Sequence, residues 1–136
     1  MIKLAHVCIE TTDLGATEAF YSAIGLTRRF DFNNRQGDLV AFYLAFDDNT
    51  FIEVIRNNTP KPDGIVRHFC IEVDDLDAMH ARLKKAGIEV SEKKLGIDNT
   101  LMISCHDPNG IFIELQQYTD ASLQLAGGVC EVDYTP

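Results

Sequence analysis

Apolar and polar residues alternate along several short stretches of this chain, and the stretches recur in the same order in its two halves. In the first half, four stretches have the period or composition of β-strands: residues 3–10, 26–32, 39–46 and 50–55. Between Asp13 and Gly25, apolar residues recur at helical spacing, with Asp13 suited to the N-cap and Gly25 to the C′ position. The pattern predicts a β-α-β-β-β unit.

The second half predicts the same order of elements after a linker at residues 57–65 that contains two prolines and a glycine. The expected strands are residues 66–73, 88–92, 100–105 and 111–116. A helix is expected between Asp75, as its N-cap, and Gly87. Residues 118–136 have no clear period, so we expect a C-terminal tail there.

The two halves also share sequence. At an offset of 62, residues 6–26 and 68–88 are identical at nine of 21 positions, and Phe-Ile-Glu recurs at residues 51–53 and 112–114. Such self-similarity indicates two copies of one supersecondary unit. We therefore predict a single α+β domain at residues 1–117, made of repeats 3–57 and 65–117, with residues 118–136 as the tail.

Charge and composition limit the classes of function. The formal net charge of −9 argues against a nucleic-acid or acidic-membrane partner, and the longest apolar run, residues 39–46, is too short to span a bilayer. No secretory pattern opens the sequence, and none of the four cysteines forms a C-x-x-C pair. We expect a cytoplasmic protein with reduced thiols and no nucleic-acid or membrane partner. The resemblance described below adds a small-molecule substrate to this expectation.

Side-chain alternation places one histidine or one glutamate on the same face of four symmetric strands. These residues are His6, Glu53, His68 and Glu114. A carboxylate in an apolar strand is costly unless it is paired or bound to a cation. If the two sheets curve towards each other, the four side chains converge, and two imidazoles with two carboxylates suit one divalent ion. We expect nickel, zinc or cobalt, with manganese or iron as alternatives.

Other residues have simpler interpretations. A single histidine on a strand is more often structural than a metal ligand, and His106, next to a predicted turn, is the strongest competing ligand. Cys8 and Cys70 share the histidine face and are interpreted as small wall residues. His80 is expected on the surface of the second helix.

The chain resembles the vicinal-oxygen-chelate superfamily, which has the glyoxalase, bleomycin-resistance and dioxygenase fold, over residues 1–117. The markers are His6 with Asp13-Leu14 and Phe20-Tyr21, Phe51-Ile52-Glu53, His68, and Asp107-Pro108-Asn109-Gly110 before Glu114. The complete His-Glu-His-Glu set is most similar to lactoylglutathione lyase (glyoxalase I). The resemblance implies a glyoxalase-like fold in which the two units form a curved eight-stranded cup. It also implies a homodimer.

The resemblance further implies a reaction on the hemithioacetal of an α-oxoaldehyde, such as methylglyoxal. Glu114, with Glu53 as its counterpart, would move a proton through an enediolate to give a 2-hydroxyacyl thioester. The implied substrate-binding residues are Glu10, Phe51, Ile55, Asn57 and Phe112. Glu10 stands where these lyases have an arginine that binds a glutathione carboxylate, so the thiol is left open.

Three alternatives remain at the level of sequence. An epimerase that acts next to a thioester carbonyl uses the same chemistry. A ring-cleaving dioxygenase normally has three protein ligands, and Glu53 would be a fourth. A non-catalytic binding or resistance protein of this fold tends to lack the ligand set.

Overall fold

The computed structural model of the 136-residue chain describes residues 6–60, 68–127 and 129. It divides into two compact units. The first unit comprises residues 1–66 and 107–111, and the second comprises residues 67–106 and 112–136. Each unit is described by itself.

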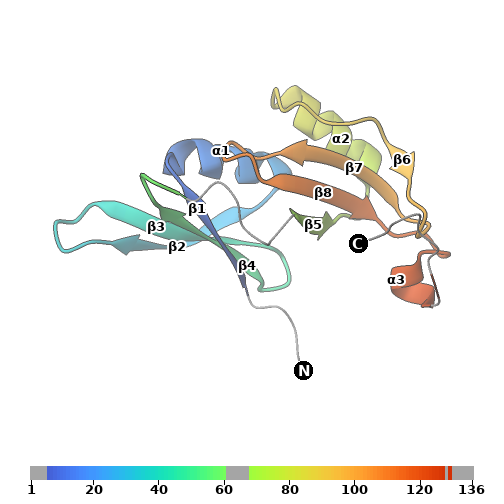
Figure 1. The fold of residues 1–136 in the computed structure, drawn as a ribbon, viewed down its shortest axis with the longest axis horizontal. Coiled ribbons are helices and arrows are strands. Elements are labelled where there is room, and N and C mark those ends of the chain that lie inside the picture. The colour runs from blue at the N-terminus through green and yellow to red at the C-terminus, as the bar shows by residue number, and fades with distance from the viewer. Residues whose placement is uncertain (1–5, 61–67, 128, 130–136) are drawn as a thin grey trace. The chain divides into compact units, whose positions relative to one another are not determined.

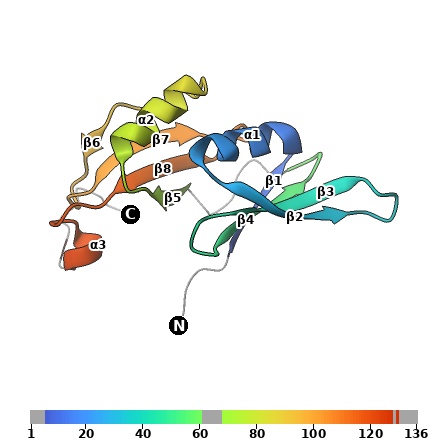
Figure 2. The ribbon, with the colours of Figure 1, turned by 180° about the vertical axis from the view of Figure 1, so that it is seen from behind.

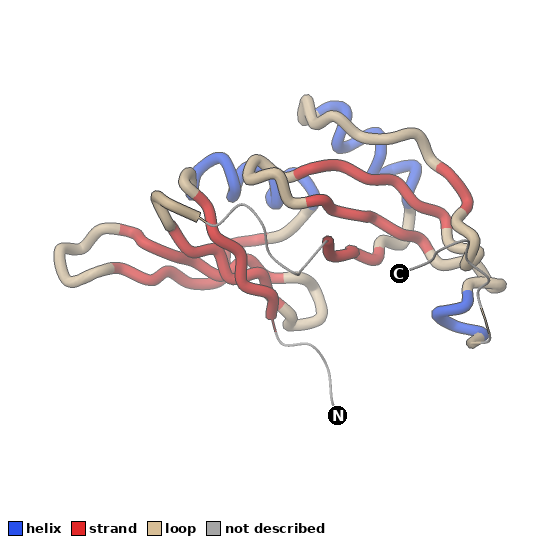
Figure 3. Tube along the Cα trace, viewed as in Figure 1, coloured by secondary structure: helices blue, strands red, loops and turns tan. Residues whose placement is uncertain are grey.

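The first unit contains a four-stranded mixed sheet with one helix (Figure 1). Its strands are β1 (His6–Thr11), β2 (Thr27–Asn33), β3 (Leu39–Ala45) and β4 (Phe51–Arg56). Their order across the sheet is β1-β4-β3-β2, with β1 parallel to β4 and the other pairs antiparallel. Figure 3 shows β2 and β3 as a long hairpin. The predicted order of elements in this half is confirmed.

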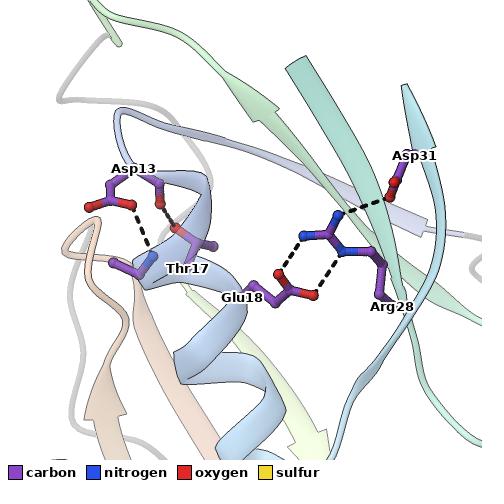
Figure 4. Close-up of polar contacts among 6 residues, drawn as sticks. Asp13, Thr17, Glu18, Arg28 and Asp31 are labelled. Carbon is purple, nitrogen blue, oxygen red and sulfur yellow. Dashed lines mark hydrogen bonds and ion pairs between the residues drawn. The ribbon is translucent and has the colours of Figure 1, made fainter. Parts of the chain in front are cut away.

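Helix α1 (Leu14–Ile24) begins and ends where the sequence indicates. The Asp13 side chain, drawn in Figure 4, accepts a hydrogen bond from the Ala16 amide at 2.9 Å. Gly25, which ends the helix, has a φ of 126°. The helix packs on β4, and Glu18 near its start forms an ion pair with Arg28 of β2. Local capping and one cross-element ion pair therefore place α1 on its sheet.

The second unit repeats this plan (Figure 2). Its elements are β5 (His68–Glu72), α2 (Leu76–Lys85), β6 (Lys94–Leu95), β7 (Leu101–His106), β8 (Phe112–Gln117) and α3 (Leu123–Ala126). The strand order is β5-β8-β7-β6, with β5 parallel to β8. Asp75 caps α2 as predicted, because its carboxylate accepts the Ala78 amide at 2.9 Å.

The strand expected at residues 88–92 is wrong. The chain instead pairs with β7 at β6, through Lys94 beside Met102 and Leu95 beside Leu101. The Ile88 amide still bonds to the Leu83 carbonyl at the end of the helix, at 3.0 Å. The chain is therefore still leaving α2 at residue 88. It first bonds to β7 at Ser91, whose amide donates to the Ser104 carbonyl at 2.9 Å, and regular pairing follows at β6.

The expected tail is partly ordered. Residues 119–126 lie against the turn before β7 and include the short helix α3. The Thr119 and Ser122 hydroxyls donate to the Asn99 carbonyl at 2.8 and 3.0 Å, and Gln124 donates to Asp98 at 2.7 Å. These contacts order the segment through side chains rather than through a buried apolar stripe.

Apolar residues on one face of each sheet and on the helix that packs against it form the cores. Those of the first unit include Tyr21, Phe42, Leu44, Ile52 and Val54. Those of the second include Leu76, Leu83, Ile103, Ile113 and Leu115. The alternation inferred from the sequence is confirmed, since the buried and less buried positions alternate along β1 and β5 and over the first five residues of β4 and β8. The face opposite each core carries the candidate ligands.

The Asp-Pro-Asn-Gly turn belongs to the first unit, although it joins two strands of the second. The Asn109 side chain accepts the Thr11 hydroxyl at 2.6 Å and donates to Thr17 at 3.0 Å. The Tyr21 hydroxyl donates to buried Asp107 at 3.1 Å. This buried network gives the motif a structural role, because it attaches the turn to α1 and β1.

Among the described residues, no helix is long and apolar enough to cross a membrane.

Candidate metal centre

The first unit brings His6 and Glu53 together on the sheet face opposite its core. Parallel pairing of β1 and β4 sets Cys8 beside Glu53 and His6 beside Phe51. Because His6 precedes Cys8 by two residues, the two ligand candidates point from the same face. The His6 Nε2 and Glu53 Oε2 atoms are 3.4 Å apart. We call these two residues the first pair.

The second unit repeats the arrangement with His68 and Glu114. Cys70 lies beside Glu114, and His68 lies beside Phe112. The His68 Nε2 and Glu114 Oε2 atoms are 3.6 Å apart, and we call these residues the second pair. The Glu53 and Glu114 side chains retain 20% and 19% of their exposure, so the two carboxylates are covered to the same degree.

The geometry of each pair fits two ligands of one divalent ion. Metal–nitrogen and metal–oxygen bonds of about 2.0–2.2 Å, at angles between tetrahedral and octahedral, place ligand atoms about 2.8–3.6 Å apart. Both observed nitrogen–oxygen distances lie within that interval. Among the described residues, no cluster of three or more His, Cys, Asp or Glu side chains is arranged to hold a metal. Convergence of both pairs on one ion therefore stays a prediction.

Each glutamate also accepts a hydrogen bond, but from a different donor. The Tyr43 hydroxyl of β3 donates to Glu53 Oε2 at 3.3 Å, whereas the Gln116 amide of β8 donates to Glu114 Oε2 at 3.4 Å. Ser104 occupies the position beside Glu114 that Tyr43 occupies beside Glu53. The two pairs are therefore alike in their ligands and different in what supports them.

Aromatic rings surround the first pair. The Tyr43 ring stacks on Phe30 at 4.5 Å and lies 5.6 Å from Phe51, measured between centroids. It also lies 5.5 Å from the His6 ring. Around the second pair, Phe112 contacts the His68 ring edge-to-face at 5.9 Å. Apolar rings next to the carboxylates reduce local hydration and strengthen the charge interactions there.

The two cysteines of this face are protonated thiols at neutral pH. Desolvation and then the charge of Glu114 raise the pKa of Cys70 to about 12. Desolvation and then the charge of Glu53 raise the pKa of Cys8. The interpretation of both cysteines as wall residues stays a prediction.

The expected substrate-binding residues occupy varied positions. Phe51 and Ile55 are partly buried on the Glu53 face of β4, and Phe112 has the matching place on β8. Glu10 is exposed on the His6 face of β1. Asn57 follows β4, where its side-chain oxygen accepts the Thr59 amide at 3.0 Å, as in an Asx turn. The binding roles of these five residues stay predictions.

Two histidines outside the pairs have structural surroundings. His106 ends β7, and its ring contacts Phe112 at 5.2 Å. His80 is less exposed on α2 than the sequence suggested, since it is partly buried and its Nε2 atom is covered by protein. Sequence reasoning missed Tyr43 because residues 39–46 are apolar almost throughout, which hides the direction of each side chain.

Comparisons with known proteins agree with the fold. Residues 3–115 match the family model of the Glyoxalase/Bleomycin resistance protein/Dioxygenase superfamily. An ethylmalonyl-CoA/methylmalonyl-CoA epimerase of Cereibacter sphaeroides is 30% identical over 131 residues, which cover 85% of this chain and 97% of that protein.

Two solved structures illustrate the structural similarity. A bleomycin resistance determinant encoded on the transposon Tn5 aligns with a TM-score of 0.69 and 22% identity, over 86% of this chain and 98% of that chain. A lactoylglutathione lyase from Agrobacterium tumefaciens aligns with a TM-score of 0.65 and 19% identity, over 85% and 92% of the respective chains. At these identities the similarity establishes the fold alone.

Proposed function

The chain belongs to the Glyoxalase/Bleomycin resistance protein/Dioxygenase superfamily, and on this premise we propose that it is a divalent-metal enzyme that moves a proton next to a substrate carbonyl. The first candidate reaction is of the glyoxalase I type, on the hemithioacetal of an α-oxoaldehyde. Members of the superfamily typically use a divalent metal and bind small molecules.

One observation carries the proposal. Each unit holds a histidine nitrogen and a glutamate oxygen at the separation that two ligands of one ion require, 3.4 Å in the first pair and 3.6 Å in the second. A sequestering protein has no need of a repeated His–Glu pair on a sheet face. The proposed ligands are His6, Glu53, His68 and Glu114.

The ion would polarise the substrate oxygens and stabilise the negative charge that forms on them. Glu114 accepts the proton from the carbon that bears sulfur and returns it to the adjacent carbon, which converts the hemithioacetal into a 2-hydroxyacyl thioester. Glu53 accepts a hydrogen bond from the Tyr43 hydroxyl and serves mainly as a ligand. Phe51, Ile55 and Phe112 exclude water from the reacting carbons.

The proposal is tested with metal-loaded protein and methylglyoxal. Thioester formation is followed with glutathione, with other thiols and without a thiol. We expect metal-dependent turnover that needs a thiol, and lower turnover with glutathione than with a thiol without carboxylates, because Glu10 repels that anion. Highest turnover with glutathione would contradict the role of Glu10.

A second candidate is epimerisation of a branched acyl-CoA thioester. The 30% identity to the Cereibacter sphaeroides epimerase favours it, and the chain aligns with 97% of that protein. The same residues would move the proton at the carbon next to the thioester carbonyl. Methylmalonyl-CoA in deuterated water tests this candidate, since metal-dependent deuterium uptake at that carbon supports it. If neither substrate reacts while metal is bound, both candidates fail.

A further inference from the structure

Tyr43 lies on β3 directly beside Glu53, and its side chain reaches both members of the first pair. Antiparallel pairing aligns the two residues across the sheet. The hydroxyl donates to Glu53 Oε2 at 3.3 Å, and the ring lies 5.5 Å from the His6 ring, tilted by 55°. One side chain therefore limits how the carboxylate and the imidazole can turn.

The ring of Tyr43 is itself held in place by aromatic neighbours. Phe30 stacks on it with an interplanar angle of 21°, while Phe32 and Phe51 contact it at 5.8 and 5.6 Å. A side chain with two rotatable bonds and three ring contacts loses little further freedom when its hydroxyl donates a hydrogen bond. The donor is thus positioned before any ligand arrives.

The hydrogen bond is compatible with metal binding by the same oxygen. An ionised carboxylate oxygen has two lone-pair sites, so Glu53 Oε2 can accept the Tyr43 hydroxyl and still offer a lone pair towards the side on which His6 Nε2 lies. Hydrogen bonds to metal ligands orient them, and their loss typically weakens metal binding by about 10–100-fold. We propose that Tyr43 is a positioning residue that orients Glu53 for metal binding. This inference rests on the proposed function.

The second unit provides the comparison. Ser104 lies beside Glu114 in the same way that Tyr43 lies beside Glu53. Its short side chain carries no ring that could pack. Glu114 accepts a hydrogen bond from the Gln116 amide instead. Gln116 lies on the same strand as Glu114, and its flexible side chain is less constrained than a packed ring. The positioning effect is therefore expected at Tyr43 and not at Ser104.

The test compares Tyr43→Phe with Ser104→Ala and the wild type. Each protein is stripped with a chelator, and the binding of Ni²⁺ and of Zn²⁺ is measured by titration calorimetry. Tyr43→Phe keeps the ring, so we expect an unchanged melting temperature, an unchanged number of ions, and a Kd raised at least tenfold. Ser104→Ala is expected to bind as the wild type does.

The outcomes separate the two proposals. If the wild type binds and Tyr43→Phe has the same Kd, the role of Tyr43 is wrong and the proposed function stands. If Tyr43→Phe weakens binding only as much as Ser104→Ala does, the role of Tyr43 is also wrong. If the wild type binds neither ion, the proposed function fails and the positioning role fails with it. A Tyr43→Leu variant, which also removes the ring, is expected to lose both metal affinity and melting temperature.

Discussion

At the scale of single residues, Glu53 and Glu114 are symmetric in position but differ in support. Each lies beside a cysteine in a parallel strand pair and near a histidine nitrogen. Glu53 accepts a hydrogen bond from the Tyr43 hydroxyl, whose ring is packed against other rings. Glu114 accepts a hydrogen bond from the side-chain amide of Gln116, which is flexible. This difference favours Glu53 as the fixed ligand and Glu114 as the group that moves a proton.

Glu114→Gln tests that division. The amide oxygen can still bind a metal but cannot accept the proton, so we expect retained metal and a loss of turnover of about 10²–10⁴-fold. Steady-state kinetics and metal analysis of the purified variant measure both. The matched variant Glu53→Gln should weaken metal binding more than Glu114→Gln does. Turnover of Glu114→Gln equal to that of the wild type would remove Glu114 from the role of base.

The sequence predicts the four ligand candidates because strand alternation places them, and the repeat pairs them. It does not predict Tyr43, whose strand is apolar on both faces, so that only the pairing with β4 shows its direction. It also does not predict the contact of Gln116 with Glu114, since alternation assigns a face but not a hydrogen bond.

At the scale of elements, the Asp-Pro-Asn-Gly turn acts through Asn109, which connects β1 and α1. Asn109→Ala removes hydrogen bonds to Thr11 and Thr17 and leaves the hydroxyls of these buried residues without those partners. We expect a loss of about 1–3 kcal/mol in the free energy of unfolding, measured by urea denaturation. The exposed Asn58→Ala serves as control and should change it by less than about 0.5 kcal/mol. Equal effects would contradict the structural role of the turn.

The segment after β8 is stabilised through Asp98. Hydrogen bonds from Gln124 and then from Thr100 lower the pKa of Asp98. A lowered folded-state pKa contributes stability that is complete above the unfolded-state pKa of about 4 and is lost as the pH falls through the folded-state pKa. Because Asp98 is only partly covered, the contribution is small.

Asp98→Asn should therefore slightly lower the free energy of unfolding at neutral pH, and the difference from the wild type should shrink as the pH falls below about 4. Urea denaturation at a series of acidic pH values measures it. Gln124→Ala, which removes one of the donors, should give a smaller change in the same direction. A pH dependence identical to that of the wild type in both variants would show that Asp98 does not stabilise this segment.

The helix caps can be predicted from the sequence, because Asp13, Asp75 and Gly25 bond to the backbone of their own helix. Most strands can be predicted as well. The position of a strand at the edge of a sheet cannot be predicted in this way, because it depends on where the chain meets the neighbouring strand. Residues 88–92 have strand composition, yet they bond to β7 only at Ser91, and regular pairing begins at Lys94. The order of residues 119–126 also depends on contacts with Asp98 and Asn99. Periodicity carries no information about such distant contacts.

At the scale of the whole molecule, each chain carries both the first pair and the second pair of ligand candidates. We propose a homodimer, as is frequent in this superfamily, and a site can then be completed within one chain or across two. Mixing His6→Ala with His68→Ala distinguishes the two arrangements. In a mixed dimer, the first pair is intact on one chain and the second pair is intact on the other. Metal binding is therefore restored, at one site per dimer, only if each site combines the first pair of one chain with the second pair of its partner.

The number of ions bound per chain tests the central claim most directly. Calorimetric titration of chelator-treated protein with Ni²⁺ should give one ion per chain, and His6→Ala and His68→Ala should each weaken that same single site. This count holds whether the site forms within one chain or across a dimer. Two ions per chain, with each variant losing only one, would show that the pairs act separately and would contradict a shared four-ligand site. No bound ion would contradict the metal centre itself.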